Sequence, residues 1–228
     1  SGLGYWAETA LHGCGFVNVN SMITDNLQTI RKAVGKHNTT LIAVSKKQPD
    51  ERIEEALACG IRTFGENRVQ EAATRWQKRR AIYPDLKLHL IGPLQTNKAK
   101  TATELFDVIH TLDREKLARE IVKHRADIPC FIQVNTGDEA QKAGIALSDL
   151  DNFYKWCVND LKMTICGLMC IPPVDAPAGL HFGLLADRAA NLNLNGLSMG
   201  MSNDYPLALR YGASHIRVGS SLFGERQS

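Results

Sequence analysis

Short apolar segments alternate with amphipathic segments from residue 22 almost to the end of the chain, and this alternation restricts the possible folds more than any other feature. Eight of the apolar segments have the length and composition of buried strands. They are residues 40–45, 62–67, 86–92, 106–111, 129–135, 163–171, 196–200 and 215–219. Before and between them, apolar residues recur at helical spacing, as in Ile23, Leu27, Ile30 and Val34.

Strands separated by helices run parallel and are covered on their outer face. Eight such units fit a (β/α)8 barrel near the short end of its size range. We predict an α/β fold with a single TIM barrel over residues 22–228, with Asp113 and Ser148 as helix N-caps. A doubly wound open sheet is the alternative. Residues 1–21 lack periodicity, so we expect an N-terminal extension that is disordered or artificially added.

Charge and cysteine content disfavour several classes of protein. The net charge is +3, and the short basic run Lys78-Arg79-Arg80 is typical of a solvated helix end, so we expect no nucleic-acid partner. No apolar run approaches a membrane span and no signal-peptide pattern opens the chain. The six cysteines lack metal-ligand spacing. We therefore expect no metal, no membrane contact and a cytoplasmic location.

In a TIM barrel, the functional residues lie at the carboxyl ends of the strands. Glycine and serine follow the last two expected strands, in "SMGMS" (198–202) and "RVGSS" (217–221), each just before a helix. Glycine lets the backbone approach an anion, and a helix N-terminus offers free N–H groups to it. Because these two loops form the usual phosphate site of the fold, the pattern predicts a phosphate-binding site.

Three basic residues stand at the end of an expected strand or inside one, where burial makes charge costly. Lys46 and Lys47 end the first expected strand, and either could contact an anion or form a Schiff base with a carbonyl. Strand alternation does not choose between them, because each shares a face with small or apolar residues. Arg217 lies inside the last apolar strand, where it could donate to a nitrogen heterocycle or pair with a carboxylate.

Several longer stretches resemble the YggS/PROSC family of pyridoxal-phosphate homeostasis proteins and, more remotely, the N-terminal barrel of alanine racemases. The resemblance extends from Met22 to Arg226. The stretches that carry it are "LIAVSK" (41–46), "FGENRVQE" (64–71), "HLIGPLQTNK" (89–98), "LSMGMSND" (197–204) and "IRVGSSLFGER" (216–226).

This resemblance implies a fold type III barrel that binds pyridoxal 5′-phosphate (PLP) as a Schiff base on Lys46. It places Arg217 against the pyridine nitrogen and Asn67 beside the ring. It places Ser202, Gly219 and Ser220 on the phosphate, together with the backbone of Met201. We also include Ser198, which lies in the expected strand 196–200 just before Met201 and Ser202, among the cofactor-binding residues. The sequence departs from the family at Lys47-Gln48, at Arg68 and in the length of segment 172–195.

The implied function is cofactor homeostasis, by buffering or delivery, without catalysis. Its expected partners are PLP and PLP-dependent apoenzymes, and we expect a monomer. An amino-acid racemase is the alternative, and a phosphosugar lyase or aldolase with a Schiff-base lysine is a third. Racemisation needs an acid and a base on opposite faces of the substrate. Tyr205 is the nearest candidate for the second group, and too few residues follow Gly219 to form the domain that supplies it in racemases. We therefore expect no catalytic residue.

Overall fold

The computed structural model describes residues 21–225 of the chain. Its strands are β1 Thr40–Val44, β2 Thr63–Glu66, β3 Lys87–Leu90, β4 Val108–Leu112, β5 Cys130–Asn135, β6 Ile145–Ala146, β7 Ile165–Met169, β8 Gly196–Ser198 and β9 His215–Val218. Its helices are α1 Met22–Val34, α2 Asp50–Ala58, α3 Val69–Ile82, the 3-10 helix η1 Thr96–Lys98, α4 Ala99–Leu105, α5 Glu115–Arg125, α6 Leu150–Asn159, α7 Ala178–Asn191, α8 Tyr205–Arg210 and α9 Ser220–Phe223. The predicted extension lies outside this range except for Ser21.

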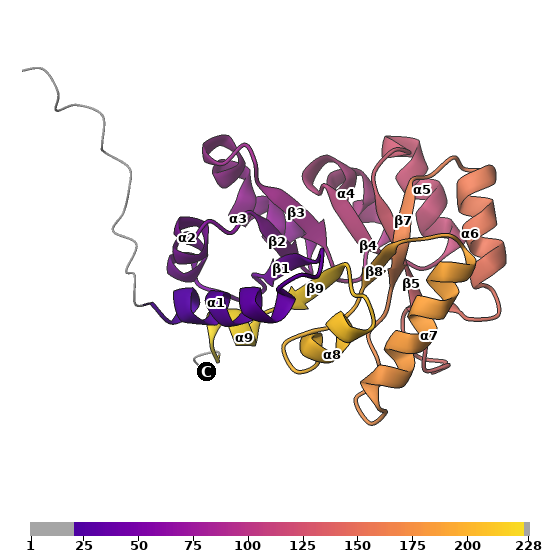
Figure 1. Ribbon diagram of the computed structural model, residues 1–228. Helices are drawn as coiled ribbons and strands as arrows, with labels where there is room; N and C mark the ends of the chain where they lie inside the picture. Colours follow the sequence, from indigo (N-terminus) through magenta and orange to yellow (C-terminus); the bar gives the residue numbers. More distant parts are fainter. Residues whose placement is uncertain (1–20, 226–228) are drawn as a thin grey trace, which may run out of the picture.

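The eight predicted strands form one closed parallel barrel. The hydrogen-bonded order is β4-β3-β2-β1-β9-β8-β7-β5, and pairing of β4 with β5 closes the ring. The predicted TIM barrel is confirmed, and the open doubly wound sheet is wrong because it would leave β4 and β5 as edges. The helices lie around the outside of the strands (Figure 1). The short β6 was not predicted; it pairs with the end of β5.

Buried side chains form two layers because successive residues of a strand face opposite sides of the sheet. The outer layer lies between strands and helices and includes Phe64, Trp76 and Ala43. The inner layer fills the barrel: a Cβ on Gly65 would lie 2.7 Å from Ile42 Cγ2 and 2.9 Å from Ile91 Cδ1. Small and branched residues therefore alternate inside the barrel, as its narrow interior requires.

Two predicted helix caps are wrong by one residue. Arg114, not Asp113, is the N-cap of α5, because the Asp113 carboxylate pairs with the Arg114 guanidinium at 2.6 Å. Asp149, not Ser148, is the N-cap of α6, and the Ser148 hydroxyl donates to its carboxylate. Within residues 21–225, no helix is long and apolar enough to cross a membrane.

Candidate functional site

The eight predicted site residues come from four neighbouring strands. In the barrel, β2, β1, β9 and β8 are adjacent, and all end on the same side. Their carboxyl ends and the loops that follow are called the rim below. The rim carries Lys46, Asn67, Ser198, Met201, Ser202, Arg217, Gly219 and Ser220. Barrel closure therefore brings together residues up to 174 positions apart, counted from Lys46 to Ser220.

The two lysines after β1 differ in their surroundings. They occupy the middle of a turn closed by the Gln48 N–H, which donates to the Ser45 carbonyl at 3.0 Å. Lys46 is half-buried, whereas Lys47 is exposed and has a left-handed φ of 58°. Lys47 lines a cavity of about 520 Å³ with Arg52 and Arg75. The turn thus places Lys47 in an exposed cavity that Phe223 and Glu225 also line, while Lys46 is half-buried directly after the strand.

A buried carboxylate holds this turn from the outside. Glu66 is fully buried, and its Oε1 accepts from Ser45 Oγ (2.6 Å), Arg75 Nη1 (2.9 Å) and Trp76 Nε1 (2.9 Å). Arg75 also donates to the carbonyls of Ser45 (2.6 Å) and Gln48 (3.0 Å). The sequence reasoning missed this network. Its signal was a glutamate at the end of an apolar strand, with an arginine on the next helix.

Glycines and serines shape the loops after β8 and β9. Gly200 has φ 94°, and a Cβ there would lie 2.6 Å from Ala208 Cβ, so both conformation and space require glycine. Ser202 Oγ accepts from the backbone N–H groups of Gly219 (3.2 Å) and Ser221 (3.1 Å). The two loops therefore meet, with backbone donors directed at one side chain. The Met201 N–H instead donates to Asp204 Oδ1 at 2.7 Å.

Asn67 and Ser220 complete the rim on its two sides. Asn67 follows β2 and is half-buried; a Cβ on Gly92 would lie 2.2 Å from its carbonyl oxygen, so glycine permits this close approach of two strand ends. Ser220 is exposed at the first position of α9. Gly219 packs beside the end of β1, where an added Cβ would lie 3.6 Å from Val44 Cβ. Lys46 follows Val44 by two residues along the chain.

Arg217 is a buried cation inside the barrel. Its side chain is 3% exposed, and no carboxylate forms an ion pair with it among residues 21–225. Nη1 donates to Ser198 Oγ (2.7 Å) and Nη2 to the Cys170 carbonyl (2.9 Å). Burial lowers the pKa of this guanidinium from its ordinary value. Guanidinium nevertheless stays charged near neutral pH, so Arg217 acts only as a donor.

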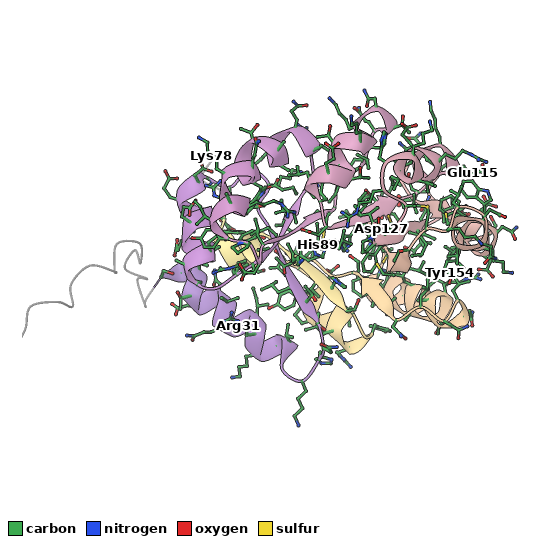
Figure 2. All side chains as sticks on the ribbon, turned by 90° about the horizontal axis from the view of Figure 1, so that it is seen from above. Arg31, Lys78, His89, Glu115, Asp127 and Tyr154 are labelled. Carbon is green, nitrogen blue, oxygen red and sulfur yellow. The ribbon has the colours of Figure 1, made fainter. Side chains whose placement is uncertain are left out.

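Three histidines lie deeper in the barrel. Figure 2 places His89 among the central strands, while Lys78, Glu115 and Tyr154 lie on the surrounding helices. Burial, followed by the repulsion of His215, lowers the pKa of His89 to about 3. Burial also lowers the pKa of His215, to about 4. His110 stacks on Phe131 with ring centroids 4.4 Å apart, and burial holds its pKa well below the ordinary value. The sequence analysis assigned no role to His89 or His110.

Elsewhere in residues 21–225, the candidate features are a second cavity and buried cysteines, and neither offers a reactive group comparable to Lys46. A cavity of about 600 Å³ opens at the opposite end of the barrel, lined by Thr39, Phe131 and His215 among others. Residues 21–225 contain no group of three metal-ligating side chains. The five cysteines in this range are free thiols, and burial raises the pKa of Cys157, Cys166 and Cys170 to about 12. These thiols are therefore poor nucleophiles.

Comparison with known proteins places the chain in a family. Residues 20–227 match the family model described as alanine racemase, N-terminal domain. A pyridoxal phosphate homeostasis protein from Vibrio cholerae is 38% identical over 220 residues, covering 90% of this chain and 93% of the relative. A pyridoxal phosphate homeostasis protein from Aquifex aeolicus is 35% identical over 229 residues, covering 92% of this chain and 100% of the relative. The chain belongs to the pyridoxal phosphate homeostasis protein family. The predicted family is thereby confirmed.

Solved structures agree with this assignment. PipY of Synechococcus elongatus, solved without PLP, matches with a TM-score of 0.83 and 38% identity over 89% of this chain and 100% of PipY. PipY with PLP bound matches with a TM-score of 0.81. Alanine racemase from Corynebacterium glutamicum matches at 13% identity with a TM-score of 0.67, over 61% of that chain. At that identity, the racemase supports the shared barrel alone.

Proposed function

We propose that this member of the family binds PLP at the rim and serves intracellular PLP homeostasis, by buffering the cofactor or delivering it. The observation that carries the proposal is the convergence of four features at one end of the barrel. They are a half-buried lysine, a buried arginine without a carboxylate, and two glycine–serine loops that present backbone donors. The relative PipY, 38% identical, has been solved with PLP bound.

The residues at the rim fit this cofactor. Lys46 supplies the primary amine for covalent attachment, and its turn is held by Glu66 and Arg75. Gly219, Ser220 and Ser202 would hold the phosphate, and the backbone N–H of Met201 would join them by exchanging its hydrogen bond to Asp204 for one to the phosphate. The donors on Gly219 and Ser221 already share one acceptor, Ser202 Oγ, and such a cluster of N–H groups suits a phosphate.

The remaining predicted residues would orient the ring. Arg217 would donate to the pyridine nitrogen, Ser198 would hold Arg217, and Asn67 would lie beside the ring. When bound, PLP supplies an aldehyde that condenses reversibly with amines and a ring that accepts electrons. A guanidinium that only donates keeps the ring nitrogen unprotonated. The chain's own residues therefore favour holding the cofactor over strong electron withdrawal.

The absence of turnover is part of the proposal. Curated relatives are named for homeostasis rather than for a reaction. Tyr205, the nearest tyrosine to the rim in sequence, is 7% exposed and packs in the outer core layer. A group packed there is poorly placed to exchange a proton with a substrate at the rim. Amino-acid racemisation remains the alternative, and the barrel shared with alanine racemase is its support.

We further propose a monomer that hands PLP to PLP-dependent apoenzymes inside the cell. A half-buried lysine on a solvent-facing rim leaves the attached cofactor accessible to a competing amine. The five described cysteines are unpaired, which is typical of proteins in reducing compartments. Sedimentation at several concentrations tests the monomer, and transfer of PLP to a purified apoenzyme, read as recovered activity of that enzyme, tests delivery.

The function is tested by adding PLP to the purified full-length chain, removing free cofactor and recording the absorbance spectrum. We expect a visible band of lysine-bound cofactor that is absent in Lys46→Ala and retained in Lys47→Ala, the matched control. The racemase alternative is tested by incubating loaded protein with L-amino acids in deuterated water. Lys46-dependent loss of the α-proton at about 1 per second or faster would establish catalysis instead.

A further inference from the structure

The burial of Arg217 poses an electrostatic problem that the rim residues alone do not solve. A charge removed from water needs a counter-charge or well-aligned hydrogen-bond acceptors. Among residues 21–225, Arg217 has no carboxylate partner, and two neutral oxygens accept from it, Ser198 Oγ and the Cys170 carbonyl. One of these acceptors leads into a longer chain of contacts.

Polar contacts continue from Ser198 through the barrel interior. Ser198 Oγ lies 2.8 Å from His110 Nδ1, and His110 Nε2 lies 2.8 Å from His89 Nδ1. The participating residues sit on four strands, β9, β8, β4 and β3, and meet only because the barrel is closed. All three contacts, including the one from Arg217, have the length of good hydrogen bonds.

Only one direction of donation satisfies every atom in this chain. Arg217 has no lone pair to offer, so Ser198 Oγ accepts from it. Ser198 is fully buried, and the acceptor in contact with its hydroxyl is His110 Nδ1. The hydroxyl therefore donates to Nδ1, because the reverse arrangement would bury an unpaired O–H. A neutral His110 then carries its proton on Nε2, donates to His89 Nδ1, and leaves the His89 proton on Nε2.

The surroundings keep both imidazoles neutral. His110 is faced by His89, His215 and Arg217, which all oppose a positive charge, and it is fully buried. His89 is faced by His215 and Lys87, which oppose protonation, and by Asp107, which favours it. Burial is the largest cause in each case, and the pKa of both histidines is lowered. Each ring therefore has one proton to give and one lone pair to offer.

We propose that Ser198, His110 and His89 form a directional hydrogen-bond chain that replaces a carboxylate counter-ion for Arg217. Every acceptor in the chain points toward the guanidinium, so its charge is stabilised by aligned dipoles rather than by a salt bridge. The remaining N–H groups of Arg217 stay available to a neutral acceptor, an aromatic ring nitrogen. Ser198 and His110 are thus positioning residues. This last step rests on the proposed PLP function; the direction of the chain does not.

The direction of the chain is tested by NMR on the cofactor-free, full-length, ¹⁵N-labelled protein. Long-range ¹H–¹⁵N spectra at pH 7 report which nitrogen of each histidine carries the proton. His89→Gln and His110→Phe provide the assignments. We expect His89 and His110 to be neutral with the proton on Nε2. In Ser198→Ala, His110 should lose this single tautomer and show a mixture. A proton on Nδ1 of either wild-type ring, or a doubly protonated ring, would overturn the chain.

The link to the cofactor is tested by the rate at which loaded protein loses PLP on dilution. His110→Phe preserves a ring stacked on Phe131 and removes the acceptor of the Ser198 hydroxyl. We expect the loss of PLP to become about three- to tenfold faster, the effect of one hydrogen bond between neutral groups. His124→Phe, on the surface of α5, is the matched control and should behave as wild type. Ser198→Ala serves if His110→Phe does not fold. A folded His110→Phe or Ser198→Ala variant with wild-type retention would overturn the positioning role.

The NMR experiment and the PLP-retention experiment distinguish failure of the hydrogen-bond chain from failure of the proposed function. If the wild-type protein takes up no PLP, the proposed function is wrong, and the NMR spectra still decide whether the hydrogen-bond chain exists. If PLP binds but the tautomers differ from those expected, the function stands and the chain is wrong.

Discussion

Removal of the Glu66 carboxylate is the most informative perturbation of the scaffold behind Lys46. In Glu66→Ala, Arg75, Trp76 and Ser45 all lose their shared acceptor. Breaking a buried ion pair by deleting one partner costs about 3–5 kcal/mol, and the side chain of Arg75 is 17% exposed, which relieves part of its penalty. We expect the free energy of unfolding to fall by about 3–4 kcal/mol.

Two further variants separate the effect of the Glu66 charge from that of its hydrogen bonds and from that of an exposed ion pair. Glu66→Gln keeps the oxygen that accepts all three hydrogen bonds and removes the charge, so we expect a loss of about 1–2 kcal/mol. Glu54→Ala removes one of the two carboxylates that pair with Arg79, a neighbour of Arg75 on α3, and Glu54 is 52% exposed. An exposed ion pair contributes about 1 kcal/mol or less, so this matched control should barely change stability.

Urea denaturation followed by circular dichroism measures these differences without relying on the fluorescence of Trp76 itself. Hydrogen exchange adds a local readout: the Gln48 amide, which closes the Lys46 turn, should exchange faster in Glu66→Ala than amides of the distant β7 strand. The reasoning is refuted if Glu66→Ala costs no more than Glu54→Ala, or if the Gln48 amide is unaffected.

Three further predictions concern backbone conformation and pH. Lys47→Gly should raise the free energy of unfolding, measured by urea denaturation, by up to about 1 kcal/mol. The reason is that Lys47 has a left-handed φ of 58°, a conformation that is unfavourable by about this amount for a residue with a Cβ. An equal or lower stability of the variant would contradict this. Gly200→Ala should lower the free energy of unfolding by about 3 kcal/mol or more, whereas Gly60→Ala should cost about 1 kcal/mol. Both glycines have positive φ, but an added Cβ clashes at 2.6 Å only at Gly200 and meets nothing at Gly60, so equal costs would count against the steric argument. Stability should also fall as the pH drops below 6.5, the ordinary pKa of histidine, because the unfolded chain then binds protons that folded His89, with its pKa of about 3, and His110 do not. Urea titrations at pH 7.5, 6.5 and 5.5 should show that the free energy of unfolding falls by about 1 kcal/mol per pH unit for each of these histidines at the acid end. If the dependence of stability on pH is the same in His110→Phe as in the wild type, the explanation is wrong.

The sequence was sufficient to predict the barrel because its information is local. Each apolar run and each helical period can be recognised alone, and their alternation admits few topologies. The resemblance to a known family extended this to the site, and barrel closure then brought the predicted residues from β2, β1, β9 and β8 to one rim. Their roles toward PLP stay predictions.

The missed features depend on side-chain contacts between separate secondary-structure elements. The Glu66–Arg75 pair joins a strand to the following helix, and the Ser198–His110–His89 contacts cross the barrel interior. The contacts inside the barrel cannot be derived without knowing which side chains face inward at the same height, and the Glu66 pair cannot be derived without knowing how α3 packs on β2. The wrong cap at Asp113 has a different cause, because a neighbouring arginine competes with the helix N-terminus for the carboxylate.

The central claim, that this protein holds PLP on Lys46, is tested most directly by chemical trapping. The full-length chain is loaded with PLP, reduced with borohydride, digested and mapped by mass spectrometry. The account predicts one pyridoxyl group per chain, on Lys46. A label on the neighbouring Lys47, labels spread over surface lysines, or no stable label would contradict it.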